Sequence, residues 1–413
     1  MTSPQRVAVT GIGVVSPLGN DAGSAFAAAA AGRSAVRRLD GAFAAGLASP
    51  IAATMSFDAS GLAEPATLRM MDRFAQFAVA AAEQALAAAG PDALPTDRER
   101  VGIFVGTGNG GTHSMDEGYR ALYGPDGGRI KPFTVLLGMP NAAGAWIGIR
   151  HDVRGPNLTY STACSSSGVS IGEAWRRVAL GELDIAIAGG AEAPLSNGSL
   201  KAWEALHTLA AVDADDPSTS CKPFARNRSG LVLGEGAAML VLEPWDRAHA
   251  RGAAVLGEIV GYGSGNDAVH ITRPGVDGQA AAMRAALRSA DLAPEAIDAI
   301  NAHGTGTAAN DAVETAAIRA VFGAHADRLM ISATKSMHGH LLGAAGAIEC
   351  ALSLMALRHG VALPTMHLRE SDPACDLDYV PNAARPAPQA TTMLSNSFAF
   401  GGTHAVLVLR AAR

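Results

Sequence analysis

The sequence predicts an α/β protein in which one unit of strands and helices occurs twice. Short apolar stretches that end in glycine, such as 101–108, are typical of strands buried on both faces. Runs with apolar residues three or four positions apart, such as 70–89, predict helices. The order strand, helix, strand and glycine turn recurs in both halves of the chain, which indicates a duplicated unit with helices packed on a sheet.

Length and composition limit the possible functions. The 413 residues are 48% apolar and only 17% charged, which is enough for a large core and for two similar halves. A net charge of -6 and a pI near 6.1 argue against nucleic-acid binding. The N-terminus lacks the pattern of a signal peptide, and no apolar stretch is long enough for a membrane span. The cysteines form no CxxC pair, which argues against disulfides or zinc and favours a reducing cytoplasm; they are Cys164, Cys221, Cys350 and Cys375.

In the first half, residues 7–15 predict a strand. Its glycines resemble a dinucleotide-binding loop only weakly, because Ser16 stands where the third glycine would be, so we expect no nucleotide cofactor. The other elements expected in this half are a helix at 70–89, strands at 101–108 and 158–160, a helix at 169–180, a strand with a glycine turn at 183–190, a helix at 201–211 and a strand at 231–242.

The second half repeats this plan. The expected elements are strands at 254–262, 299–306, 329–334 and 393–397, and helices at 278–290 and 341–357. The last strand leads to a glycine pair at 401–402, which we take as the counterpart of the earlier glycine turn. The sequence therefore predicts two halves, 1–250 and 251–413, whose catalytic loops meet at the ends of strands.

The stretch 161–168 is the first candidate for chemistry, because Cys164 lies among small hydroxyl residues where a strand turns into a helix. The start of a helix presents free backbone amides. It favours negative charge, can lower the pKa of a thiol, and suits a nucleophile whose product oxyanion needs donors. A buried structural cysteine is the alternative.

Two other stretches carry histidines. His303 ends a strand and is flanked by glycine and hydroxyl residues, so its imidazole could donate to a carbonyl, or it could be a structural histidine in a turn. Lys335, His338 and His340 precede a helix of small residues, whose glycines imply close packing. The alternating side chains of His338 and His340 should diverge and no carboxylate or cysteine joins them, so we expect no metal site.

A third stretch, 396–403, combines two phenylalanines with a flexible glycine pair and is a further candidate for the site. The alternative interpretation is a buried strand that ends in a turn. Taken together, these motifs resemble the β-ketoacyl-acyl-carrier-protein synthases, in particular the chain-elongating KAS II-like class. The resemblance runs from residue 7 to residue 409, and the motifs occur in the family's order. It implies a thiolase-like duplicated αβαβα fold of five layers.

The resemblance also implies an activity, with no cofactor. An acyl chain held on Cys164 would condense with malonyl-acyl carrier protein, with loss of carbon dioxide, in fatty-acid or specialised acyl or polyketide biosynthesis. The partners implied are the acyl carrier protein and a second copy of the chain, or a chain-length-factor-like subunit in a heterodimer. A non-catalytic chain-length factor is the alternative, but such partners generally lack the cysteine. A degradative thiolase would use a cysteine base near the C-terminus, and Cys375 lies outside the Phe-Gly-Gly loop.

By the same resemblance, His303 and His340 would hydrogen-bond the malonyl carbonyl, and Lys335 would support this arrangement of charge. The backbone amides of Cys164 and Phe400 would form the oxyanion hole, and the Phe400 side chain would gate the malonyl site. The implied substrate-binding residues are Thr305, Thr307 and Phe398.

A carrier protein of this family is acidic, so a chain of net charge -6 would need a local basic patch to bind it. Ordinary solvated charges are the alternative reading of the candidates, which are Arg69, Arg73, Arg129 and Lys131. Several positions depart from the family's usual pattern and favour a specialised pathway: Glu204, Ala225, His338, Ala399 and His404.

Overall fold

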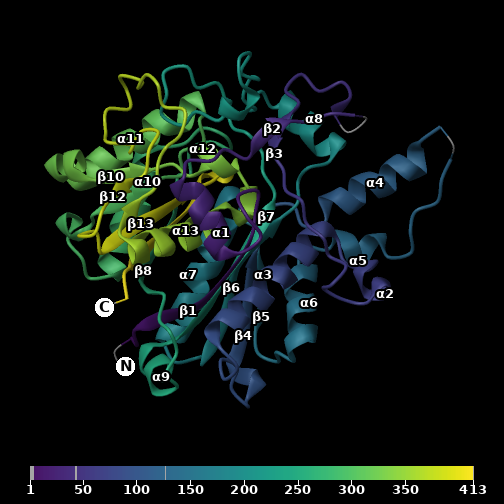
Figure 1. Ribbon diagram of the computed structural model, residues 1–413, viewed down its shortest axis with the longest axis horizontal. Helices are drawn as coiled ribbons and strands as arrows, with labels where there is room; N and C mark the ends of the chain where they lie inside the picture. The colour runs from purple at the N-terminus through teal and green to yellow at the C-terminus, as the bar shows by residue number, and fades with distance from the viewer. Residues whose placement is uncertain (1–3, 42–43, 126, 413) are drawn as a thin grey trace.

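The computed structural model describes residues 4–41, 44–125 and 127–412 (Figure 1). Its main feature is a 10-stranded sheet in the order β10-β9-β13-β14-β8-β1-β7-β6-β4-β5. The first half contributes β1 (Val7–Val15), β4 (Val101–Gly106), β5 (Asn157–Tyr160), β6 (Ile185–Glu192) and β7 (Gly236–Pro244). The second contributes β8 (Gly257–Asn266), β9 (Ala299–Asn301), β10 (Met330–Ser332), β13 (Thr392–Phe398) and β14 (Thr403–Arg410).

The two halves of the sheet have the same topology. Counted outward from the centre, each half presents its first, fifth, fourth, second and third strand. The pairings also match, because β7 and β14 are antiparallel to both neighbours, whereas β4 and β9 are parallel to theirs. Within the 10-stranded sheet, the halves meet where Val7–Val9 pairs with Gly257–Ile259. The position of the boundary at residue 250 stays a prediction.

Helices complete five layers. α3 (Arg73–Ala89) and α6 (Ala142–His151) cover the outer face of the first half, and their apolar residues form one core with its strands. α10 (Val276–Ser289) and α11 (Ala308–Phe322) cover the outer face of the second half. α7 (Ser166–Ala179) and α13 (Ala345–His359) lie between the two halves and contact strands of both (Figure 1). The predicted αβαβα arrangement is therefore confirmed.

Shorter elements surround these layers. The helices are α1 (Ala22–Ala30), α2 (Pro65–Leu68), α4 (Thr112–Tyr123), α5 (Thr134–Gly138), α8 (Asn197–Ala205), α9 (Trp245–Ala250) and α12 (Lys335–His338). Two small ribbons pair β2 (Val36–Arg38) with β3 (Ile51–Ala53), and β11 (Val361–Ala362) with β12 (Arg385–Pro386). No helix in the described part of the chain is both long enough and apolar enough to cross a membrane.

Some local predictions are wrong. The glycine turn expected at 183–190 does not exist, because Gly189 and Gly190 lie inside β6 and pair with strands on both sides. Their lack of a side chain has another cause. A Cβ on Gly190 would lie 2.6 Å from the Cβ of Ser167, so the glycine lets α7 pack directly on the strand. The helix expected at 201–211 ends at Ala205, and the strand expected from residue 231 begins at Gly236.

Candidate active site

Cys164 lies where β5 gives way to α7. A short 3-10 turn, Ala163–Ser165, separates the strand from the helix, and Ala163 has a φ of 50°. A non-glycine residue in the left-handed region costs about 1–3 kcal/mol and persists only where the surroundings enforce it. The turn presents the Cys164 side chain, which is 7% exposed, at the base of a cavity of about 190 Å³. The predicted sharp turn from strand to helix is present.

His303 and His340 come from the second half of the chain and meet Cys164 in this cavity. His303 follows β9, and His340 follows α12. The sulfur of Cys164 and one nitrogen of each imidazole lie within 4.8 Å of one another. The two imidazole rings are perpendicular, with centroids 5.4 Å apart at an angle of 83°. The candidate site therefore lies between the two halves, as strand-end loops of a duplicated unit should arrange it.

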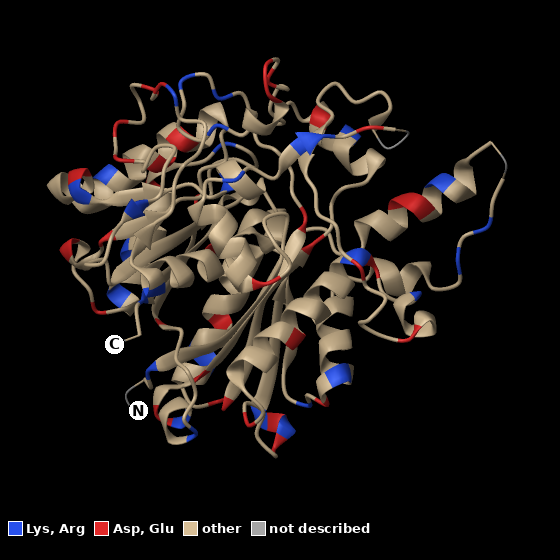
Figure 2. Ribbon diagram, in the orientation of Figure 1, with Lys and Arg blue, Asp and Glu red and all other residues tan. Residues whose placement is uncertain are grey.

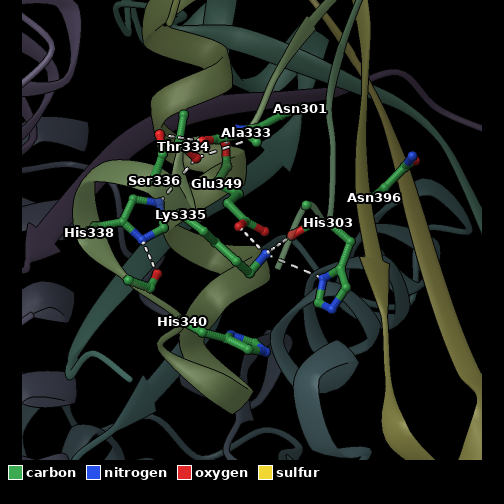
Figure 3. A network of polar contacts seen from close by, with 12 residues as sticks. Asn301, His303, Ala333, Thr334, Lys335, Ser336, His338, His340, Glu349 and Asn396 are labelled. Atoms are coloured by element: carbon green, nitrogen blue, oxygen red, sulfur yellow. Dashed lines mark hydrogen bonds and ion pairs between the residues drawn. The ribbon is translucent and has the colours of Figure 1, made fainter. Parts of the chain in front are cut away.

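Lys335 lies behind His303 and is almost completely buried (Figure 3). Its Nζ donates to Oε1 of Glu349 at 2.5 Å and to the backbone oxygen of His303 at 2.6 Å. The same Nζ lies 3.3 Å from Nδ1 of His303. Because an ammonium group can only donate, Nδ1 accepts, and the ring proton of His303 belongs on Nε2.

His340 has the same tautomer for a different reason. Its Nδ1 accepts from the backbone amide of Leu342 at 3.2 Å, so its proton is also on Nε2. That Nε2 is buried and has no partner among the described residues. Burial, and then the positive charge of Lys335, hold the pKa of both His303 and His340 well below 6.5. The site thus presents two neutral N–H donors, one of which lacks an acceptor, and could stabilise a developing negative charge.

The Cys164 thiol differs from the sequence expectation. Burial raises its pKa to about 11, although Lys335 and the backbone amides of Phe400 and Cys164 itself act in the opposite direction. The expected lowering at the helix start is wrong, because desolvation of the thiolate outweighs the few donors around it. The amides of Phe400 and Cys164 hydrogen-bond the sulfur, so both point at the position where an acyl group would be attached.

Phe400 lies at the wall of the cavity, and its ring stacks on Trp203 of α8 with centroids 6.1 Å apart. The loop that carries it depends on Gly401 and Gly402, whose φ values are 84° and 77°. Phe398 is buried, lines the cavity, and meets the His303 ring edge-on at 6.1 Å. Thr305 and Thr307 also line the cavity, and their hydroxyls lie 2.9 Å apart. Every residue predicted for catalysis or substrate binding except Lys335 thus lines one cavity.

The four candidate docking residues lie elsewhere, and none is among the described residues that line this cavity. Arg69, Arg129 and Lys131 are exposed, and the last two lie in the segment between α4 and α5 (Figure 2). Arg73 is different, because its guanidinium donates twice to the buried carboxylate of Glu235 and lies over the Phe77 ring. Its charge is already paired, and Arg73 is a weak candidate for binding an acidic partner.

His338 does not face His340. Its Nδ1 donates to the backbone oxygen of Gly339 at 2.8 Å, and its Nε2 lies 3.0 Å from Oγ1 of Thr334 (Figure 3). Burial, with the charge of Lys335, lowers the pKa of His338 to about 3, so the ring is neutral. The two histidines diverge as expected, and His338 supports the turn between Lys335 and His340.

Sequence reasoning missed several buried charges around the site. Glu349, the partner of Lys335, is the one acidic residue in the largely apolar helix α13. An acid in such a helix could have indicated a buried ion pair. Glu192, in β6, accepts from the amides of Gly108 and Gly343 and so ties the two halves together beside Cys164. His404, noted only as a departure, donates from Nε2 to the carboxylate of Asp267 at 2.8 Å.

These observations define a class. A five-layer duplicated fold, a cysteine at a strand-to-helix turn, and two neutral imidazoles facing it are the arrangement of thiolase-fold enzymes that transfer and condense acyl groups. Comparison with known proteins identifies the family. The family model described as the β-ketoacyl synthase N-terminal domain matches residues 4–248, and the model of the C-terminal domain matches residues 256–369. The chain belongs to the β-ketoacyl synthase family.

Individual relatives agree with this assignment. The chain is 42% identical to a 3-oxoacyl-[acyl-carrier-protein] synthase 2 of Coxiella burnetii, over 98% of each chain. It is also 42% identical to nodulation protein E of Rhizobium leguminosarum bv. trifolii, over 98% of this chain and 99% of the relative. Among solved structures, a type II polyketide ketosynthase in complex with its acyl-carrier protein matches with a TM-score of 0.91 and 31% identity, over 99% of this chain and 100% of that chain.

Proposed function

We propose that the protein catalyses the decarboxylative condensation of an acyl chain, held on Cys164, with malonyl-acyl carrier protein. The observation that carries this proposal is the pair of neutral Nε2–H donors of His303 and His340 next to a buried thiol. An enzyme that only transferred acyl groups, without forming a carbon–carbon bond, would not need a second donor site for an enolate. The relatives that are named 3-oxoacyl-[acyl-carrier-protein] synthase 2 support the same reaction.

In the first half-reaction, the sulfur of Cys164 forms a bond with the carbonyl carbon of the acyl thioester. The carbonyl oxygen becomes negative and accepts from the amides of Cys164 and Phe400. The bond to the carrier thiol then breaks, and the carrier thiol leaves with the proton that the cysteine has lost. The acyl chain remains on Cys164.

In the second half-reaction, a malonyl thioester takes the place of the departed carrier. Its terminal carbon–carbon bond breaks, carbon dioxide leaves, and the electron pair moves to the thioester carbonyl. The Nε2–H groups of His303 and His340 donate to that oxygen and stabilise the enolate. The enolate carbon attacks the acyl carbonyl, the Cys164 sulfur leaves as a thiolate and takes a proton from solvent, and a β-ketoacyl thioester results.

Mass spectrometry of the purified chain tests this proposal. After incubation with a panel of acyl-carrier thioesters, the acyl mass should appear on the peptide that contains Cys164 and should be absent in Cys164→Ala. Cys350→Ala is a matched control, because Cys350 is also buried, its pKa is raised to about 12 by burial, and it lies outside the cavity. Acylation that persists in Cys164→Ala would refute the assignment. The same panel would identify the preferred acyl chain.

The acyl carrier protein is the proposed partner, as in the complex whose ketosynthase resembles this chain. Arg69, Arg129 and Lys131 remain the candidate docking cations, since each is exposed. Reversing the charge at Arg129 and Lys131 together should slow association and flatten its dependence on salt. Reaction with a carrier-free thioester should be unchanged. Equal losses with both substrates would show that these residues do not form the docking surface.

We also propose that a second copy of the chain covers α4 and α5, and that the enzyme works as a homodimer in a reducing cytoplasm. Large apolar side chains are exposed on these two neighbouring helices, including Tyr123 at 80% and Val135 at 73%. Large exposed apolar side chains gathered on neighbouring helices are typical of an interface. Tyr123→Asp with Val135→Asp should convert a dimer into a monomer in light scattering. A monomeric unmodified protein, or a heterodimer with another subunit, would refute the homodimer.

A further inference from the structure

The catalytic cavity has an uneven distribution of charge. Among the described residues that line it there is no aspartate or glutamate, whereas Arg273 and four histidines are present. His303, His340 and His404 belong to the inner part of the cavity, next to Cys164 and Phe398. Arg273 is the one permanently charged residue in this lining. The described lining of the cavity therefore offers one fixed positive charge and no negative charge to a ligand.

Arg273 lies in an exposed segment, 267–275, that borders the cavity. It makes no ion pair or hydrogen bond with any residue that the structure describes. The one acid in this segment, Asp267, pairs elsewhere, because one carboxylate oxygen accepts from His404 and the other from the amide of Gly275. The Arg273 guanidinium is thus an unpaired cation at the edge of a cavity that holds a buried nucleophile.

His270, in the same segment, adds a second donor. Its Nδ1 accepts from the backbone amide of Thr272 at 3.1 Å, which leaves Nε2 to carry the proton of the neutral ring. His270 is exposed and also lines the cavity. Arg273 and His270 together offer the forked and single N–H donors with which proteins bind phosphate oxygens.

We propose that Arg273, assisted by His270, binds the phosphate of the phosphopantetheine arm that delivers acyl groups to Cys164. This inference rests on the proposed function. The arm carries its thioester at one end and its phosphodiester at the other. When the sulfur end reaches Cys164 at the base of the cavity, the anionic end lies near the mouth. Arg273 then fixes how far the arm enters and acts as a positioning residue for both half-reactions.

A pair of carrier-free substrates isolates this contact. Acyl-pantetheine and acyl-4'-phosphopantetheine have the same thioester and differ only in the phosphate. At low salt, we expect the intact protein to acylate Cys164 with a kcat/KM about fivefold higher for the phosphorylated substrate than for acyl-pantetheine. This ratio corresponds to the upper end of the energies measured for exposed ion pairs. Arg273→Gln should reduce this ratio to about one without changing the rate with acyl-pantetheine, and Arg273→Lys should retain part of it.

Arg328→Gln is the matched control, because Arg328 is also an exposed cation but does not line the cavity. This variant should keep the ratio of kcat/KM values that the unmodified protein shows for the two substrates. The ratio should also fall as salt is added, since the contact is exposed. A fivefold ratio that survives in Arg273→Gln, or no preference in the unmodified protein, would overturn the proposal. Failure of Cys164 to accept acyl groups from either substrate would instead refute the proposed function.

Discussion

The buried pair of Lys335 and Glu349 allows a sharp test of the electrostatics behind the site. Both side chains are almost inaccessible, at 1% and 0% exposure, and the Nζ to Oε1 distance is 2.5 Å. Replacing Lys335 by methionine keeps most of the volume and removes the charge. Breaking a buried pair in this way leaves Glu349 either charged without a partner or forced to take a proton, and the loss of the pair costs about 3–5 kcal/mol. We expect Lys335→Met to lose stability by that amount at neutral pH.

The dependence on pH identifies the cause of this loss. Burial raises the pKa of Glu349 to about 7, and the charge of Lys335 opposes that shift. In the unmodified protein, folded Glu349 therefore binds a proton between the ordinary pKa of 4.5 and about 7 while the unfolded chain does not. Its contribution to stability falls across this window and is constant above it. In Lys335→Met the pKa of Glu349 rises further, so the fall continues above pH 7.

One proton of difference corresponds to about 1.4 kcal/mol per pH unit. Lys335→Met should therefore lose up to about 2.7 kcal/mol more than the unmodified protein between pH 7 and pH 9. Urea unfolding at pH 7, 8 and 9 and fixed protein concentration measures this difference. Lys335→Met with Glu349→Gln is the control and should remove the extra slope. Parallel stability curves for the single variant and the unmodified protein would refute the reasoning.

Three further predictions concern the site. His303→Ala should still transfer an acyl chain to Cys164 but lose malonyl decarboxylation by about a hundred- to a thousandfold, measured by release of carbon dioxide; an equal loss of both would contradict the assigned roles. Alkylation of Cys164 by iodoacetamide should rise about tenfold per pH unit up to pH 10, because burial raises the thiol pKa to about 11; a plateau near pH 8.5 would contradict it. His338→Leu should cost about 1–3 kcal/mol in urea unfolding by leaving the Gly339 carbonyl without its donor, whereas His338→Asn should recover part of this. Equal losses in both variants would indicate packing alone.

The sequence predicted the fold well because the pattern is strong and repeated. Buried strands such as β4 read as continuous apolar runs, and their order along the chain was the same in both halves. The duplicated plan predicted that catalytic loops of both halves meet at strand ends, but the convergence of Cys164 with His303 in particular was implied only by the resemblance to the family. The prediction of a turn from a pair of glycines was less reliable. Gly189 and Gly190 serve close packing inside β6, which depends on α7 and cannot be inferred from the strand itself.

The electrostatics of the site could not be predicted, because the interacting groups are distant in sequence. Glu349 reaches Lys335 across a turn and a helix start, and Lys335 reaches His303 from another strand's end. The pKa of Cys164 depends on how completely its side chain is buried, and the residues next to it in the sequence do not predict that burial. A helix start alone favours the thiolate by a fraction of a kcal/mol, whereas burial disfavours it by more.

The tautomers of the two histidines explain why the proposed reaction needs two sets of donors. Both Nδ1 atoms already accept, one from Lys335 and the other from a backbone amide, and both Nε2 atoms carry protons. Neither ring can therefore take the proton of Cys164 in the first half-reaction without losing a hydrogen bond or becoming charged in a buried site that disfavours charge. They can only donate, which suits the enolate oxygen of the second half-reaction. The acyl carbonyl of the first depends on the amides of Cys164 and Phe400 instead. On this assignment the half-reactions share the nucleophile but not the groups that stabilise charge, so a variant of His303 can separate them.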